Sequence, residues 1–357
     1  MPKKAVALLF LCAGLSLCLG CTTTSNTFLY ATIPGSNEIR AYREDPNSGV
    51  LTELSVSPIA AGPGVESIVI HPSKKFLYTA NSGEGNVSTF TIGSQGTLSE
   101  SASRTTAGSV PTLLTMDAGG NYLFVANSGS NDISVFSIGS SGALSQVAAN
   151  FPIGMTPLNM KVSPSGDFLY VTGQGGAQGY IEVFSVAQGV LGQTPVIGSP
   201  FLTGANPLGL AIDQAGKFLY TANKGDNTIS EFTINGDGSL TPLPGSPVGQ
   251  SFSSPVALLI DKSGKYLYVA NQGSPSNLAG FTLGSDGGIT LLSGSPFGTG
   301  ANPSFIATDS GGKYLFVGSQ GSSGAVQSFS LDTGSGTLTS VQSYSVSGTA
   351  TSIAITP

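Results

Sequence analysis

Few residues of this chain could carry out acid–base, nucleophilic or metal chemistry. His71 is the only histidine, and the three cysteines, Cys12, Cys18 and Cys21, all lie close to the N-terminus. A zinc or iron site built on several imidazoles is therefore excluded, and no Ser-His-Asp or Cys-His arrangement is possible away from His71. We expect neither a metal site nor a cofactor.

Two charged residues interrupt apolar runs and are the candidates for a ligand site. Lys161 lies within NMKVSP (159–164), and Glu66 precedes SIVIHP (67–72). A charge inside such a strand is costly to bury unless it is paired or reaches water. Either both side chains point into a wet central channel and mark its ligand-accessible part, or each reaches channel water without a further role. The second interpretation is favoured.

His71 follows one of these apolar runs, at a turn. The equivalent turns hold Asp117, Ser163, Asp213, Asp261 and Asp309. A short polar side chain there bonds the backbone two residues on and fixes the turn. The aspartates are equivalent positions in separate repeats, so they cannot gather around one ion. A turn role for His71 is favoured over a catalytic one, and His71, Glu66 and Lys161 are the weak catalytic candidates.

A repeat that fills most of the chain positions these residues. An opening such as FLYTAN (76–81) is followed by a Gly/Asn-rich turn and a second strand such as NVSTFTI (86–92). Seven copies open at residues 28, 76, 122, 168, 218, 266 and 314, which are 46 to 50 residues apart. A fixed period of roughly 40–50 residues with several short strands predicts a β-propeller.

Each copy has an apolar strand before it and a weaker polar strand after it, which gives four antiparallel strands in each blade. One aromatic position recurs on the third strands and is assigned to the inter-blade core: Tyr42, Phe90, Phe136, Phe184, Phe232, Phe281 and Phe329. The chain ends with SIAITP (352–357), which matches SIVIHP and has no copy after it. We therefore predict an all-β, seven-bladed propeller closed by the C-terminal strand joining the N-terminal blade.

The N-terminus has the pattern of an export signal. A basic start is followed by an apolar core over residues 5–19 and by Gly20. Gly20-Cys21 resembles a bacterial lipobox, although the two residues before Gly20 depart from the usual pattern. The resemblance implies that Cys21 is lipidated, and the alternative is an ordinary cleaved signal. The predicted organisation is a signal peptide over 1–20, a short tether over 21–27 and a single propeller over 28–357.

The charge balance limits the partners. Without the two lysines of the leader, eleven basic residues face nineteen acidic ones, for a net charge near −8. This balance argues against nucleic acid and against electrostatic adhesion to anionic lipid. We expect an exported, lipid-anchored protein of the cell envelope, monomeric, whose partner is a small molecule or an envelope protein.

YLFVANSGSNDISVF (122–136) and FLYTANKGDNTISEF (218–232) resemble the repeat of the seven-bladed lactonase-like propellers, which overlap with YVTN-type surface propellers. The resemblance covers nearly all of residues 28–357. Its enzymatic members imply hydrolysis of 6-phosphogluconolactone or carboxymuconate lactones by His, Arg and acidic residues at one face. Arg40, Arg43 and Arg104 lie away from the expected channel, so no catalytic residue carries over.

Two functions follow. The favoured one is an envelope-anchored propeller that acts as a non-catalytic binding or scaffold module. The alternative is a lactonase of the 6-phosphogluconolactonase-like kind, which would hydrolyse a small lactone at the channel mouth with Glu66, Lys161 or His71.

Overall fold

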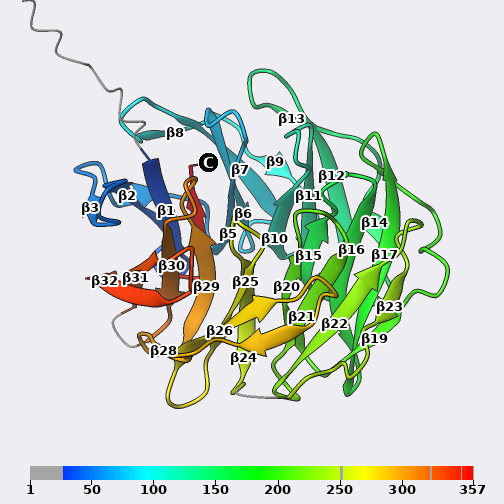
Figure 1. The fold of residues 1–357 in the computed structure, drawn as a ribbon. Coiled ribbons are helices and arrows are strands. Elements are labelled where there is room, and N and C mark those ends of the chain that lie inside the picture. Colours follow the sequence, from blue (N-terminus) through cyan, green and yellow to red (C-terminus); the bar gives the residue numbers. More distant parts are fainter. Residues whose placement is uncertain (1–26, 250–251, 322–323, 347, 357) are drawn as a thin grey trace, which may run out of the picture.

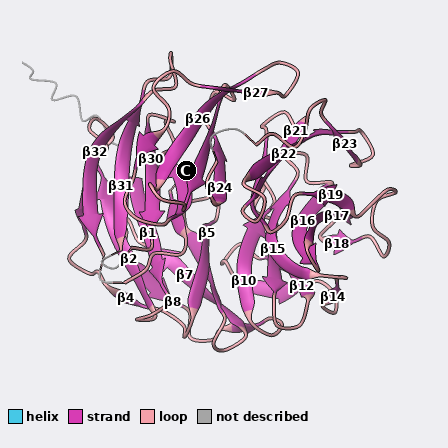
Figure 2. Ribbon diagram, turned by 90° about the horizontal axis from the view of Figure 1, so that it is seen from below, coloured by secondary structure: helices cyan, strands magenta, loops and turns pink. Residues whose placement is uncertain are grey.

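The computed structural model describes residues 27–249, 252–321, 324–346 and 348–356. The predicted signal and Cys21 lie outside the described residues. Seven small antiparallel sheets are arranged in a ring, and the described residues form strands and loops without a helix (Figures 1 and 2). The prediction of an all-β, seven-bladed propeller is confirmed.

Each sheet is one blade, and the blades are numbered in chain order. The strands of each blade are named from the inner strand outward. Blade 1 consists of β33 (Ile353–Ile355), β1 (Thr27–Ile33), β2 (Glu38–Glu44), β3 (Leu51–Glu53) and β4 (Ile59–Ala60). Blade 2 consists of β5 (Val65–Ile70), β6 (Phe76–Asn81), β7 (Asn86–Ile92), β8 (Leu98–Glu100) and β9 (Thr105–Thr106). Blade 3 consists of β10 (Pro111–Met116), β11 (Tyr122–Asn127), β12 (Asp132–Ile138), β13 (Leu144–Gln146) and β14 (Phe151–Pro152).

The remaining blades follow the same order. Blade 4 consists of β15 (Thr156–Val162), β16 (Phe168–Gly175), β17 (Gln178–Ala187), β18 (Val190–Leu191) and β19 (Phe201–Thr203). Blade 5 consists of β20 (Pro207–Ile212), β21 (Phe218–Asn223), β22 (Thr228–Ile234) and β23 (Leu240–Pro242). Blade 6 consists of β24 (Pro255–Ile260), β25 (Tyr266–Asn271), β26 (Asn277–Leu283), β27 (Ile289–Leu291) and β28 (Phe297–Gly298). Blade 7 consists of β29 (Pro303–Thr308), β30 (Tyr314–Ser319), β31 (Ala325–Leu331) and β32 (Leu338–Ser345).

The outer edge differs from the predicted single fourth strand. In blades 1, 2, 3, 4 and 6, two short strands pair with different parts of the third strand. Between these two short strands the chain no longer pairs with the third strand. A serine side chain there can accept a hydrogen bond from a backbone N–H of the third strand. Ser57 Oγ accepts the Ala41 N–H at 3.3 Å, and Ser295 Oγ accepts the Gly280 N–H at 2.9 Å. The backbone donors therefore stay satisfied although the ladder is interrupted.

The aromatic position of the third strands packs between blades as predicted. Each of the seven side chains is at most 3% exposed. A second aromatic position, on the second strands, joins neighbouring blades by hydrogen bonds. Tyr30, Tyr78, Tyr170, Tyr220 and Tyr268 each donate a hydroxyl to a glycine carbonyl of the next blade, at 2.7 to 3.2 Å. Burial of a tyrosine is favourable when its hydroxyl finds a partner in this way.

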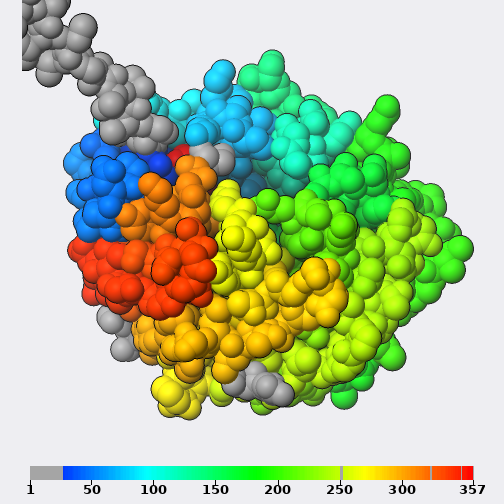
Figure 3. Space-filling model, in the orientation of Figure 1, coloured from blue at the N-terminus to red at the C-terminus, as the bar shows by residue number. Residues whose placement is uncertain are grey.

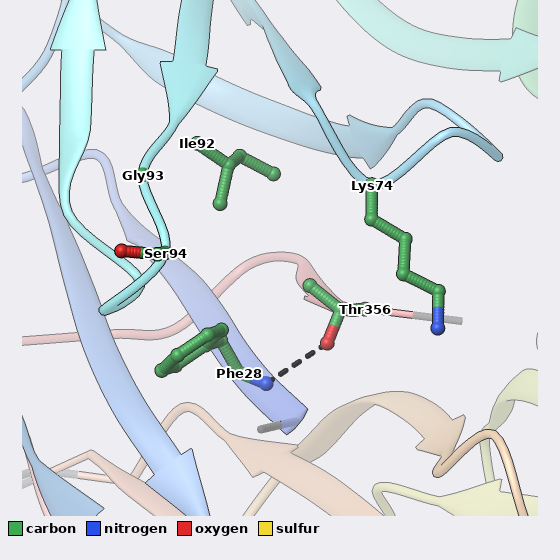
Figure 4. Close-up of a pocket in the computed structure, with 6 residues that line it drawn as sticks. All are labelled: Phe28, Lys74, Ile92, Gly93, Ser94 and Thr356. Atoms are coloured by element: carbon green, nitrogen blue, oxygen red, sulfur yellow. Dashed lines mark hydrogen bonds between the residues drawn. The ribbon is translucent and has the colours of Figure 1, made fainter. Parts of the chain in front are cut away.

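The ring closes where the two ends of the propeller meet. β33 pairs antiparallel with β1, with Leu29 opposite Ile355 and Ala31 opposite Ile353. Beyond this pairing, Thr356 Oγ1 accepts the Phe28 N–H at 2.9 Å (Figure 4). The red C-terminal segment accordingly lies against the blue N-terminal strand in Figures 1 and 3. The predicted closure by residues 352–357 is confirmed over the described residues, and it removes the open edge of the ring.

Candidate functional site

The two faces of the ring differ in the turns that they carry. The start of each inner strand pairs with the end of the second strand, as Val65 does with Asn81, so both ends share one face. We call this the mouth face. The opposite face carries the turns between inner and second strands, such as residues 71–75. The inner strands enclose a cavity of about 540 Å³ that extends from the mouth face to the level of Lys161.

A repeated β-bulge shapes the mouth of this cavity. In β5 the pairing register with β6 shifts between Val65 and Ser67, so that Glu66 is the extra residue. The inner strands of blades 3 to 7 shift at the same place. Bulges of this kind redirect a side chain and occur next to functional sites. The resulting mouth ring, all of it lining the cavity, is Glu66, Thr112, Leu158, Leu208, Val256, Ser304 and, ahead of β33, Thr351.

Glu66 lies half-buried on the wall of this cavity. Its backbone carbonyl accepts hydrogen bonds from Thr351 Oγ1 at 2.9 Å and from Thr32 Oγ1 at 3.3 Å, which tie blade 2 to blade 1 at the seam of the ring. Burial raises the pKa of the Glu66 carboxyl above its ordinary value. An ionised carboxylate whose pKa is raised is a stronger base than an ordinary carboxylate.

Lys161 lines the same cavity deeper in, on β15 of blade 4. Its side chain is exposed within the channel that the inner strands enclose. This environment lowers the pKa of the Lys161 ammonium group, because desolvation disfavours the charged form. The structure therefore places both predicted charges on the channel wall, on blades two positions apart in the ring.

Three further polar residues at the mouth were missed in the sequence. Lys224, Gln272 and Gln320 follow the second strands of blades 5, 6 and 7 and also line the cavity. The Lys224 ammonium group donates to Gln272 Oε1 at 2.9 Å. This hydrogen bond joins blades 5 and 6 and fixes the position of the ammonium group. A signal was available in the sequence, because Lys224 is the one charged residue at a repeat position that five of the other copies fill with Ser or Gln and the first with Pro34.

His71 lies on the opposite face, outside this cavity. Its Nε2 donates to the Gly120 carbonyl of blade 3 at 2.9 Å, and its Nδ1 accepts from Ser73 Oγ at 2.8 Å. Both ring nitrogens are thus hydrogen-bonded, Nδ1 within its own turn and Nε2 to the equivalent turn of blade 3. The equivalent aspartates hold their turns as predicted: Asp261 Oδ1, for example, accepts the Tyr266 N–H at 2.8 Å. The structure does not bring His71 together with Glu66 and Lys161.

The other charged groups of the described residues lie away from the cavity. Arg40 pairs with Glu53 at 3.1 Å, and Arg104 pairs with Glu100 at 2.8 Å, both on outer parts of their blades. No group of three or more His, Cys, Asp or Glu side chains that could hold a metal ion occurs in residues 27–356 as far as they are described. In the same part of the chain, no helix is long and apolar enough to cross a bilayer.

A smaller pocket of about 240 Å³ lies on the opposite face, beside the closure of the ring (Figure 4). Phe28, Ile92 and Thr356 line it, and the Lys74 side chain borders it. Two of these residues form the closing hydrogen bond. We assign this pocket to the packing of the seam.

The cavity therefore combines one carboxyl group, two ammonium groups, amide side chains and aliphatic side chains. Glu66 on blade 2 and Lys224 on blade 5 line this cavity from blades three positions apart in the ring of seven. A ligand bound between them would meet a proton acceptor on one side and a positive charge on the other. Such a pair can activate a water molecule and stabilise a developing oxyanion.

Comparison with known proteins gives this site a context. The family model described as lactonase, 7-bladed β-propeller matches residues 18–157, 148–246 and 241–355. A candidate 6-phosphogluconolactonase from Bacteroides fragilis is 23% identical, with a TM-score of 0.79 over 94% of this chain and 99% of that one. The periplasmic gluconolactonase of Pseudomonas aeruginosa is 22% identical, with a TM-score of 0.73 over 92% and 98%.

At such identities the solved structures establish the fold alone. Among curated proteins, no sequence relative matches this chain. The family model, however, covers almost the entire propeller. The chain belongs to the seven-bladed lactonase propeller family.

Proposed function

We propose that this protein is a hydrolase that opens a small lactone at the channel mouth. The observation that carries the proposal is the cavity itself, whose lining at the mouth of a lactonase-family propeller includes both Glu66 and Lys224. The family membership favours this enzymatic alternative over the non-catalytic scaffold that the sequence alone placed first.

The proposed reaction uses two residues. The oxygen of a water molecule forms a bond to the lactone carbonyl carbon, while Glu66 accepts the proton of that water. The negative charge that develops on the carbonyl oxygen is stabilised by the Lys224 ammonium group, which its bond to Gln272 holds in place. The bond between this carbon and the ring oxygen then breaks, the alkoxide takes the proton from Glu66, and a hydroxy acid is released.

Hydrolysis of 6-phosphogluconolactone and of δ-valerolactone, followed by acid release in a pH-stat, tests this function. Glu66→Gln is expected to lower kcat by about 100-fold or more, the usual contribution of a general base. Because Glu66 must be ionised to act, kcat/KM should rise with pH through a carboxyl pKa above the ordinary range.

Two variants serve as matched controls for Glu66→Gln. Glu53→Gln alters an exposed glutamate on the rim of blade 1, and His71→Gln alters the opposite face. Both should retain full activity. If no lactone is turned over, or if Glu66→Gln hydrolyses lactones as fast as the parent, the proposal fails; ligand binding without turnover would restore the scaffold interpretation.

We also propose that the protein is exported and anchored by a lipid on Cys21. The chain enters the propeller at Thr27 on the face opposite the mouth, because β1 starts there. A tether of a few residues would hold that face toward the membrane and leave the mouth open to solvent. Cys21→Ser should release the protein into the soluble fraction, and unchanged membrane association would contradict the anchor.

A further inference from the structure

The mouth ring is divided into a polar half and an apolar half. The polar half, on adjacent blades 7, 1, 2 and 3, consists of Ser304, Thr351, Glu66 and Thr112. The apolar half, on adjacent blades 4, 5 and 6, consists of Leu158, Leu208 and Val256. We call these three residues the apolar arc. The division follows the order of the blades, so each half of the mouth ring is one continuous arc. At the same face, blades 5 and 6 also carry Lys224 and Gln272, which bond each other.

The apolar arc continues into the channel. Leu258 and Leu259, two and three residues below Val256 on β24, are half-buried and line the same cavity. On blade 4 the aliphatic surface ends at Lys161, three residues below Leu158. At about 3.3 Å per residue of strand, the distance from the mouth ring to Lys161 is roughly 10 Å along the channel. This length suits an aliphatic chain of moderate size.

A lactone ring that carries several hydroxyl groups fits this wall poorly. Hydroxyls that face the apolar arc would lose their water without gaining a hydrogen bond, which is costly. Polar groups beside the arc already bond within the protein: Asn159 Nδ2 donates to the Leu208 carbonyl at 2.6 Å, and the Lys224 ammonium group donates to Gln272 Oε1 at 2.9 Å. A site built in this way selects against polyhydroxylated substrates and favours apolar ones.

We propose that the substrate is a lactone that bears an alkyl chain in place of hydroxyl groups. The ring lies at the mouth between Glu66 and Lys224, and the chain runs down the apolar arc toward Lys161. This inference rests on the proposed lactone hydrolysis. This substrate differs from the sugar lactones in the names of the solved relatives, since the three side chains of the apolar arc offer hydroxyl groups no hydrogen bond.

The test compares lactones of the same ring size with chains of increasing length. δ-Valerolactone has no chain, δ-octanolactone and δ-decanolactone carry propyl and pentyl chains, and glucono-δ-lactone carries hydroxyl groups. Because a buried methylene is worth about fourfold in binding, kcat/KM should rise steeply from valerolactone to decanolactone, mainly through KM. Glucono-δ-lactone should be the poorest substrate of the series.

Variants of the apolar arc localise the effect. Leu208→Asn should lower kcat/KM for δ-decanolactone by about tenfold or more and lower it far less for δ-valerolactone, which has no chain to contact the arc. Val256→Thr keeps the shape of the side chain and should also lower kcat/KM for δ-decanolactone. This second variant keeps the test valid if Leu208→Asn fails to fold. The matched control is Leu202→Asn on the outer edge of blade 4, where Leu202 is 64% exposed, and its chain preference should equal that of the parent.

The outcomes separate this inference from the proposed function. Turnover that is independent of chain length, or that is fastest with glucono-δ-lactone, overturns the alkyl-chain substrate and leaves lactone hydrolysis standing. If no lactone is hydrolysed, the proposed function fails, and titration calorimetry of the same lactones with the Glu66→Gln variant decides the inference. Affinity that increases with chain length and weakens in Leu208→Asn supports the apolar arc as the binding surface, and affinity without this trend refutes it.

Discussion

Replacing Glu44 by glutamine is expected to stabilise the protein at pH 8 and to leave its stability near pH 5 almost unchanged. Glu44 ends β2 at the seam between blades 7 and 1 and is 2% exposed. Neither of its carboxyl oxygens has a hydrogen-bond partner among the described residues. The groups that act on it are Asp309 and Asp45, with the buried ring of Tyr314 beside them.

The magnitude follows from the proton that Glu44 retains. Burial, with a smaller contribution from Asp309 and Asp45, raises the pKa of Glu44 from 4.5 to about 8. Between these values the folded protein holds a proton that the unfolded chain has released, so stability falls as pH rises. One proton corresponds to about 1.4 kcal/mol per pH unit, or about 3 kcal/mol between pH 5 and pH 7.

Thermal unfolding followed by circular dichroism at pH 5, 6, 7 and 8 measures this effect. The Tm of Glu44→Gln minus that of the parent should grow by a few degrees across the series. Glu53→Gln, an exposed glutamate on the neighbouring strand β3, is the control and should give a constant difference. A Tm difference for Glu44→Gln that is the same at pH 5 and pH 8 would refute the assignment of a retained proton to this residue.

Two further predictions concern contacts between blades and a third concerns the closure of blade 1, and each is checked by urea unfolding of the variant beside the parent. Tyr78→Phe removes the hydroxyl that bonds the Gly142 carbonyl at 2.9 Å and should cost about 1 kcal/mol; an unchanged midpoint would contradict that role. Gly142→Ala should cost about 1–3 kcal/mol, because φ is +82° there and the new Cβ would lie 2.5 Å from the Phe76 ring; a neutral effect would show that the ring can move. Thr356→Val removes the hydrogen bond to Phe28 that closes the ring and should lower the free energy of unfolding by about 1 kcal/mol. A variant as stable as the parent would contradict this contribution.

Much of the fold could be read from the sequence because the repeat is local and regular. The period of the FLYTAN-type openings determines the number of blades, and the unpaired SIAITP at the end of the chain determines how the ring closes. The split outer strands could not be predicted in the same way. Their interruption depends on side chains such as Ser57, which replace a backbone acceptor only when the third strand lies beside them.

For the site, the sequence determined which residues depart from the repeat, and it singled out Glu66 and Lys161 correctly as charges in inner strands. Only the tertiary structure decided that a bulge turns Glu66 toward the channel, that Lys224 joins it at the mouth, and that His71 lies on the opposite face. The physical reason is the circular arrangement of the blades. Residues from blades 2, 4 and 5, far apart in the chain, share one cavity, and their proximity depends on the packing of all seven sheets rather than on any local pattern.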